Sequence, residues 1–186
     1  MVNEEIIKAC IEKERKAQFE LFKLCYGFLM AICRRYHSNK DDAEAILNTA
    51  FLKILDNLKK YRSEVPFKLW IRRIMLNTII DDFRKNKKYR ENISVEMTIY
   101  PEQKQSDLNL ADLELDAAYL YDMLDRLPDM SKRVFCLHAV DGFKHQEIAK
   151  QLEISEGTSK WHVSTARGLL KEMLEKAEKK TLARSI

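Results

Sequence analysis

The sequence predicts an all-α protein with two small helical domains joined by a flexible, acidic linker. Only 4 Gly and 3 Pro occur among 186 residues, which is too few for the many turns of a β-sandwich or barrel. Apolar residues recur at helical spacing in one segment after another. The charge changes sign twice along the chain, which indicates two modules and a connecting segment. A hydrophobic fraction of 46% is ample for a core and argues against extensive disorder.

The charge blocks, together with a loss of helical periodicity after Glu91, place the first domain at residues 1–92, the linker at 93–113 and the second domain at 114–186. Residues 1–95 carry 20 Lys and Arg against 13 Asp and Glu, residues 96–129 carry 2 against 9, and residues 130–186 carry 11 against 7. Two basic blocks suit contacts with a polyanion at both ends of the chain. An unevenly charged, solvated surface explains the same pattern equally well.

Met1–Cys10 lacks a basic segment followed by an apolar one, so no secretory signal is expected. No run of about 18 apolar residues occurs, so we expect a cytoplasmic protein without direct membrane insertion. Cys25 and Cys33 lie eight residues apart in a helical pattern and are expected to pack as small apolar residues. The spacing of the four cysteines, which include Cys10 and Cys136, disfavours zinc binding, and we expect no metal and no cofactor.

Helical periodicity runs from Leu21 to Tyr36, and a second helix is expected from about Asp42 to Leu58. The segment Ser38–Asp42 separates them and supplies N-cap residue types. The buried stripe of the second helix consists of Ala43, Ile46, Leu47, Ala50, Phe51 and Ile54.

The opposite face of this second helix is not purely polar. Leu52 and Leu55 lie there beside Asn48 and Asp56. These leucines either cover another helix of the same chain or meet a partner protein, and the sequence favours neither.

A loop at Tyr61–Pro66 precedes a third helix, expected from Phe67 to about Lys88, because Pro66 disfavours a helical conformation at Val65 and suits a first helical position. The expected apolar stripe of the third helix is Phe67, Trp70, Ile71, Ile74, Met75 and Thr78. A polar stripe lies beside Trp70 and consists of Arg73, Asn77, Asp81 and Arg84. It is either a solvated strip with an Asp81–Arg84 ion pair or a surface that hydrogen-bonds a ligand. Five cations among residues 84–90 favour a polyanion ligand.

Helix resumes from about Asp112 to Leu127, and the C-terminal part then has the pattern of a helix-turn-helix motif. Gln146–Leu152 is a short helix, Ile154–Thr158 a tight turn, and a longer helix follows with Ser155 as its expected N-cap. The inward face of the longer helix is Ser159, Val163, Ala166 and Leu170. In this motif the outward face enters the major groove of DNA, and here it is expected to expose Lys160, Trp161, His162, Ser164 and Arg167. A helical hairpin without DNA contact is the alternative.

Motifs in both halves of the chain resemble the bacterial sigma-70 family of RNA polymerase sigma factors. Those similar to its region 4 are Leu127-Pro128-x4-Arg133-x-Phe135, Gly142-Phe143, Glu147-Ile148-Ala149, Ile154-Ser155-Glu156-Gly157-Thr158 and Ala166-Arg167. Those similar to region 2 are Asp42-Ala43-Glu44, Phe51-Leu52 and Phe67-x2-Trp70-Ile71-x2-Ile74-x2-Asn77-x3-Asp81-x2-Arg84. The resemblance spans about residues 18–90 and 115–175. No domain-sized segment lies between them, as in the extracytoplasmic-function (ECF) group, which lacks regions 1.1 and 3.

The resemblance implies a protein that binds core RNA polymerase and directs initiation at specific promoters. Region 2 would bind the clamp helices of the polymerase β′ subunit through Asp42, Glu44, Asn48, Leu52, Leu55 and Asp56. It would also capture a flipped base of the melted −10 element and hold the single strand, with Tyr61, Arg62, Ser63, Trp70, Arg73, Asn77, Arg84, Lys87 and Lys88.

Region 4 would meet the β flap of the polymerase and read the −35 duplex through Ser155, Glu156, Thr158, Ser159, Lys160, Trp161, His162, Ser164 and Arg167. Members of the ECF group are typically held by an anti-sigma factor, so the resemblance implies such a partner beside core polymerase and promoter DNA.

The chain departs from the family pattern at four positions of region 4. Glu153 stands where Gly is common, Ser159 where a β-branched apolar residue is common, and His162 and Thr165 where Arg is common. The two missing arginines remove phosphate or guanine contacts, for which Trp161 and His162 are candidate replacements. These departures bear on the −35 sequence rather than on the fold.

Two other functions fit parts of the sequence. A helix-turn-helix regulator with an N-terminal sensing domain is one, but a ligand pocket has no need of the Asn77-centred helix and its basic extension. A metal-dependent nuclease using Asp81 and Asp82 is the other, but adjacent helical residues point about 100° apart and cannot readily share a metal. Neither an H-E-x-x-H motif nor a P-loop is present, so no enzymatic activity is expected.

Overall fold

The computed structural model describes the backbone of residues 2–92 and 112–182 and the side chains of residues 2–86 and 119–177. Helices, turns and loops account for this part of the chain, which contains no strand. The chain divides into two compact units, Met1–Ile93 and Ser94–Ile186. The all-α fold class with two helical units is therefore confirmed. The expected linker, residues 93–113, lies almost entirely outside the described residues.

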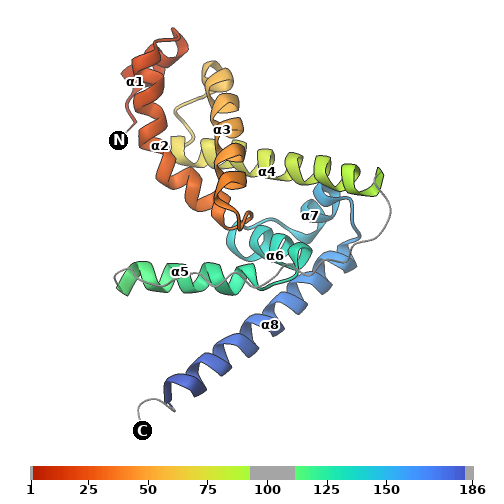
Figure 1. Cartoon of the computed structure of the whole chain (residues 1–186). Helices are drawn as coiled ribbons and strands as arrows, with labels where there is room; N and C mark the ends of the chain where they lie inside the picture. The colour runs from red at the N-terminus through yellow and green to blue at the C-terminus, as the bar shows by residue number, and fades with distance from the viewer. Residues whose placement is uncertain (1, 93–111, 183–186) are drawn as a thin grey trace. The chain divides into compact units, whose positions relative to one another are not determined.

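The first unit contains α1 (Glu4–Ile11), α2 (Arg15–Arg34), α3 (Lys40–Asn57), the 3₁₀ turn η1 (Leu58–Lys60) and α4 (Phe67–Asn92) (Figure 1). Helices α2, α3 and α4 each pack against the other two, and α1 packs on α2 and η1. The buried residues of α2 follow helical spacing: Ala17, Leu21, Cys25, Leu29, Ile32 and Cys33.

Helix α3 begins at Lys40, two residues before the expected start at about Asp42, and its N-cap lies within the segment that was expected to supply it. Asn39 is its N-cap, and the side-chain oxygen of Asn39 accepts a hydrogen bond from the backbone N–H of Asp41 at 2.9 Å. The buried residues of α3 are Ala43, Leu47, Ala50, Phe51 and Ile54. The expected stripe is thus correct except for Ile46, which is half-buried.

The buried face of α4 differs from the predicted stripe. Ile71, Met75 and Thr78 are buried as expected, whereas Phe67, Trp70 and Ile74 are only half-buried. Three apolar residues outside the stripe, Leu76, Ile79 and Ile80, are buried instead. Helix α4 packs against both α2 and α3, so its buried face is wider than the stripe of a helix with one neighbour. As a result, the side of α4 that carries Trp70 stays partly open.

The second unit contains α5 (Asp112–Asp125), α6 (Asp129–Phe135), the π-helical turn η2 (Cys136–Val140), α7 (His145–Leu152) and α8 (Glu156–Leu182) (Figure 1). Helices α6 and α7 both pack on α8, as a helix-turn-helix requires. The core of this unit is formed by Met123, Leu127, Val134, Cys136, Leu137, Ile148, Leu152, Val163 and Ala166.

Glu153 has a left-handed backbone at the C-cap of α7, with φ 55° and ψ 50°. This conformation favours glycine, because a Cβ atom there crowds the following carbonyl. The residue departs from the family pattern, but the turn between α7 and α8 keeps the conformation that a glycine would give it.

Candidate nucleic-acid and polymerase interfaces

The loop before α4 brings three aromatic rings together. The ring centroid of Tyr61 lies 5.2 Å from that of Phe67 and 5.3 Å from that of Trp70. The centroids of Phe67 and Trp70 are 5.7 Å apart. The Tyr61 hydroxyl donates a hydrogen bond of 3.0 Å to the backbone carbonyl of Val65, which closes the loop. Arg62 and Ser63 lie exposed between these anchors. Edge-to-face and tilted packing of this kind fixes the ring orientations and leaves Trp70 half-buried at the surface.

Beside this aromatic cluster lies a hollow of about 280 Å³ between α3 and α4. Two of the expected −10 residues, Trp70 and Asn77, line it. The other lining residues are Lys53, Asn57, Lys60, Ile74 and Thr78. The hollow thus combines an indole, two amides and two ammonium groups, which are the group types that stack on bases, hydrogen-bond base edges and neutralise phosphates.

Lys53, Asn57 and Lys60 also line the hollow, although no sequence motif indicates them. They lie on α3 and η1 at intervals of four and three, so they share one face. The Lys60 ammonium donates a hydrogen bond of 3.0 Å to the side-chain oxygen of Asn57. The spacing was visible in the sequence, but its meaning depends on α4 packing against this face.

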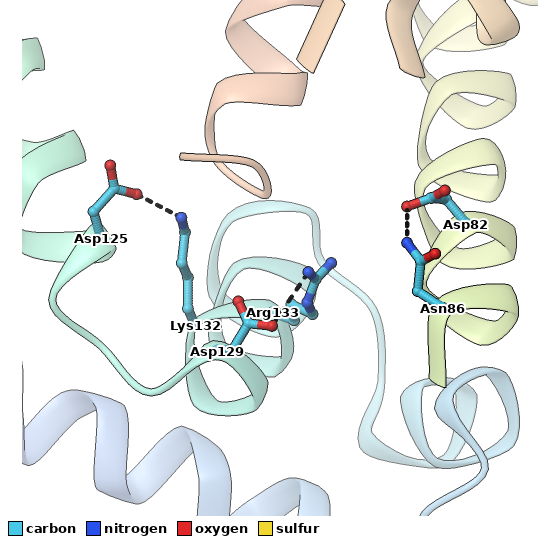
Figure 2. Close-up of polar contacts among 6 residues, drawn as sticks. All are labelled: Asp82, Asn86, Asp125, Asp129, Lys132 and Arg133. Carbon is cyan, nitrogen blue, oxygen red and sulfur yellow. Dashed lines mark hydrogen bonds and ion pairs between the residues drawn. The ribbon is translucent and has the colours of Figure 1, made fainter. Parts of the chain in front are cut away.

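Of the four residues in the polar stripe of α4, Asn77 lines the hollow and the other three do not. Arg73 is exposed and Arg84 half-buried, and neither lines the hollow. The Asp81 carboxylate pairs with the Lys53 ammonium of α3 at 3.1 Å, across the two helices. Asp82 accepts a hydrogen bond of 3.0 Å from the Asn86 side chain (Figure 2). Lys87 and Lys88 lie on α4, but their side chains are outside the described residues.

The expected polymerase-binding residues lie along α3. Asp42, Asn48 and Asp56 are exposed, and Glu44 and Leu55 are half-buried. Leu52 is 62% exposed, so no described helix covers it. Three further large apolar side chains, Phe19, Leu24 and Tyr26, are exposed on the neighbouring helix α2. The Tyr26 hydroxyl donates to Glu44 at 3.3 Å, which ties the two helices at this surface. Of the two interpretations of Leu52, a partner-facing role fits this exposure.

The N-terminal turns of α8 carry the expected −35 residues. Ser155 is the N-cap, since its hydroxyl accepts a hydrogen bond of 2.9 Å from the backbone N–H of Thr158. Glu156 and Lys160 form an ion pair at 2.8 Å, and the hydrogen bond from Lys160 lowers the pKa of the Glu156 carboxyl. Fully or partly exposed side chains of this group are Ser155, Glu156, Thr158, Lys160, Trp161, His162, Ser164 and Arg167.

Two of the expected −35 residues have their polar side chains directed at a neighbouring helix, one of them fully and the other partly buried. Ser159 is 0% exposed, and its hydroxyl lies 3.0 Å from Nδ1 of His145 on α7, so it cannot contact DNA in this conformation. His162 is half-buried, and its Nδ1 lies 2.9 Å from the hydroxyl of Ser131 on α6. The expectation of a DNA contact is wrong for Ser159, and His162 is less exposed than expected. The reason is that each side chain is within hydrogen-bond distance of a residue on a neighbouring helix: Ser159 of His145, and His162 of Ser131.

A histidine pair lies next to Ser159. The rings of His138 and His145 stack with centroids 4.1 Å apart, and Nδ1 of His138 lies 2.9 Å from the backbone carbonyl of Phe143. The pKa of His145 is lowered by burial and by the nearby His138. Burial also lowers the pKa of His162. Both imidazoles are therefore favoured in their neutral form.

Helix α5 is tied to the helix-turn-helix by a buried cation. Lys132 on α6 is 3% exposed, and its ammonium donates to the Asp125 carboxylate at 2.5 Å (Figure 2). Arg133 pairs with Asp129 one turn earlier on α6, at 3.4 Å. Breaking the Lys132 pair would leave a buried charge, so it fixes how the end of α5 meets α6.

All four cysteines are buried free thiols. Burial raises the pKa of Cys25 to about 11 and that of Cys33 to about 12, so both stay protonated at neutral pH. This confirms that Cys25 and Cys33 pack as small apolar groups. Within the described part of the chain, no three His, Cys, Asp or Glu side chains are grouped to hold a metal ion, and no helix is long and apolar enough to cross a membrane.

The described chain thus has two helical units: one carries a hollow beside three packed aromatic rings, and the other carries a helix-turn-helix, a motif typical of DNA-binding proteins. Comparison with known families narrows this class. The family model of sigma-70 region 2 matches residues 21–89, and that of sigma-70 region 4 matches residues 117–170. The chain therefore belongs to the sigma-70 family of RNA polymerase sigma factors, which are transcription initiation factors and not enzymes.

Curated relatives agree with the family. The chain is 29% identical to RNA polymerase sigma factor SigV of Bacillus subtilis (strain 168), over 77% of this chain and 82% of the relative. It is 26% identical to ECF RNA polymerase sigma factor SigW of the same strain, over 92% of this chain and 98% of the relative. Among solved structures the chain is similar to the sigma factor RpoE in complex with the anti-sigma factor NepR from Bartonella quintana. The identity is 21%, the match covers 84% of this chain and 95% of the other, and the TM-score is 0.48.

The two family models and the curated relatives support the ECF sigma factor and not the helix-turn-helix regulator with a sensing domain. The N-terminal half, which that alternative assigns to sensing, matches region 2. As an ECF-type sigma factor, the chain binds core RNA polymerase and directs initiation at specific promoters.

Proposed function

We propose that residues 1–92 bind the polymerase clamp and hold an extruded base of the melted −10 element, and that residues 114–186 read the −35 duplex through α8. Residues 93–113 would connect these two functions. The hollow between α3 and α4 is the observation that carries the −10 part of this proposal, because its lining offers an indole, amides and ammonium groups to one nucleotide.

The hollow suits a single base energetically. Extruding a base from a duplex costs a few kcal/mol, about as much as the roughly 1–3 kcal/mol that stacking on an aromatic side chain returns. Trp70 offers the aromatic surface, and the Asn77 amide offers both a donor and an acceptor to a base edge. The ammonium groups of Lys53 and Lys60, which line the same hollow, would neutralise the flanking phosphates. Capture can therefore offset extrusion without ATP.

The second unit would set its register on the duplex through phosphate contacts from Lys160 and Arg167, while side chains at the outward pole of α8 contact base edges. Because Ser159 is buried, it would support the recognition helix from inside rather than contact DNA. Ser155, at the helix N-terminus, leaves backbone N–H groups of the first turn available to a phosphate.

Polymerase binding would use the α3 surface around Leu52 for the β′ clamp helices and the second unit for the β flap. Because core polymerase and promoter DNA are cytoplasmic partners, we propose that the protein acts in the cytoplasm. An anti-sigma factor is a further partner that the family membership supports, and co-purification from cells under non-inducing conditions would reveal it.

Replacing Asn77 by Ala tests the assignment of the hollow. Asn77 is exposed on α4, so its loss leaves the core intact. We expect promoter melting, followed by permanganate reactivity of unpaired thymines, to fall about two- to tenfold, the range of one or two hydrogen bonds. Affinity for core polymerase should not change. Asn86→Ala, on the same helix but hydrogen-bonded to Asp82, serves as the control and should melt promoters normally. Equal loss of melting and polymerase binding in Asn77→Ala would show a structural role.

A further inference from the structure

The first turns of α8 carry one large side chain among small ones on their outward face. The buried residues Ser159, Val163 and Ala166 define the inward face. Steps of 100° per residue put Trp161 opposite them, and its indole is 61% exposed. The residues closest to Trp161 on this outward face are no larger than threonine: Gly157, Thr158, Ser164, Thr165 and Gly168.

The cations of this segment do not lie at the outward pole. Lys160 lies about 100° to one side of Trp161 and is paired with Glu156 at 2.8 Å. Arg167 lies about 120° away on the same side. The imidazole of His162 turns inward, with Nδ1 2.9 Å from the hydroxyl of Ser131. On the outward face of the first turns of α8, the indole of Trp161 is therefore the side chain that projects furthest from the helix axis.

The indole is also supported from inside. The rings of Trp161 and His162 meet edge to face, with centroids 4.9 Å apart. His162 is in turn bonded to Ser131, which is buried on α6. This arrangement limits the orientations of the indole before any DNA is bound and so lowers the entropic cost of a defined contact.

The chemistry of the major groove then selects the base. Among base edges in this groove the C5-methyl group of thymine is the apolar one, and the O4 acceptor of thymine lies next to it. An indole has an apolar body and one N–H donor, and it lacks the paired donors with which arginine binds guanine. We propose that Trp161 is a specificity-determining residue that selects a thymine in the −35 element through the C5-methyl group. This inference rests on the proposed function, because it requires α8 in the major groove.

Deoxyuridine substitution tests the inference, since deoxyuridine differs from thymidine only by the missing methyl group. The polymerase holoenzyme containing the full chain is bound to promoter duplexes in which each −35 thymine, on either strand, is replaced in turn. At one position the affinity should fall roughly fourfold, the value of one buried methyl group. Trp161→Ala should bind the thymine duplex several-fold more weakly and lose the difference between thymine and uracil, and Trp161→Phe should keep that difference.

Leu174→Ala is the matched control. It removes an exposed apolar side chain from a later turn of α8 and should keep the wild-type response to deoxyuridine. If the wild-type holoenzyme protects the −35 region but responds to no deoxyuridine, or if Trp161→Ala keeps the response, this inference is overturned alone. If the wild-type holoenzyme does not protect the −35 region, the proposed function fails together with it.

Discussion

The ammonium of Lys53 on α3 lies 3.1 Å from the carboxylate of Asp81 on α4, and Lys53 also lines the hollow with Trp70 and Asn77. Both side chains are about half exposed, so this ion pair contributes at most about 1 kcal/mol to folding. The larger effect of Asp81 is on ligand binding. Its carboxylate neutralises one of the two lysines that line the hollow and repels an approaching phosphate.

Replacing Asp81 by Asn should therefore strengthen the binding of the −10 single strand. We expect the holoenzyme to bind a −10 oligonucleotide more tightly, and the dependence of log affinity on log salt to steepen by about one unit of slope. The free energy of unfolding should change by less than about 1 kcal/mol. Fluorescence anisotropy over a range of salt concentrations measures the first two quantities. Asp82→Asn removes the same charge one residue along and should have a smaller effect; identical behaviour of the two variants would show that the effect is not local to Lys53.

Replacing Leu52 by Asp should abolish binding to core polymerase without unfolding the chain. The side chain is exposed in the isolated chain, so a charge there costs little until a partner must cover it. We expect at least a roughly 30-fold loss of affinity, as for an interface hot spot. Leu69→Asp is the matched control, since Leu69 is 55% exposed on α4 and outside the α3 surface. A large loss of helicity by circular dichroism in Leu52→Asp would place Leu52 in the core instead.

The stability of the second unit should fall as the pH drops below about 6.5, the ordinary pKa of histidine. The pKa of His145 and that of His162 are lowered in the folded state, so below 6.5 the unfolded chain takes up protons that the folded chain does not. His138, Lys160 and Arg167 oppose a charge on His145, while Glu156 favours it.

Urea unfolding between pH 5 and 8 measures this effect, with the fluorescence of Trp161 as the signal in a Trp70→Phe background. The carboxyl of Glu156 also has a lowered pKa, but the stability it contributes is lost only near and below pH 4.5, outside this window. The double variant His145→Gln, His162→Gln should flatten the pH dependence. Equal stability of the parent at pH 5 and pH 7 would contradict the expectation.

Local features were predictable from the sequence, whereas features that join helices were not. The capping role of Ser155 follows from its position before a helix. Helical spacing places Leu52 opposite the buried stripe of α3, but whether another helix covers that face was left open by the sequence. The wall of the hollow formed by Lys53 and Lys60 depends on how α4 packs against α3. The burial of Ser159 was implicit in its spacing with Val163, but its bond to His145 needs the packed α7. In each case the missing information is a contact between segments far apart in the sequence.

The measurement that tests the central claim most directly is reconstituted transcription. Core polymerase from the bacterium that encodes this chain is combined with the purified full chain and a library of its genomic fragments, and transcript 5′ ends are mapped. We expect a set of start sites that share two upstream elements at −10 and −35 and that disappear when the chain is omitted. Absence of any start site that depends on the chain, with core polymerase shown to be active with another sigma factor, would contradict the account.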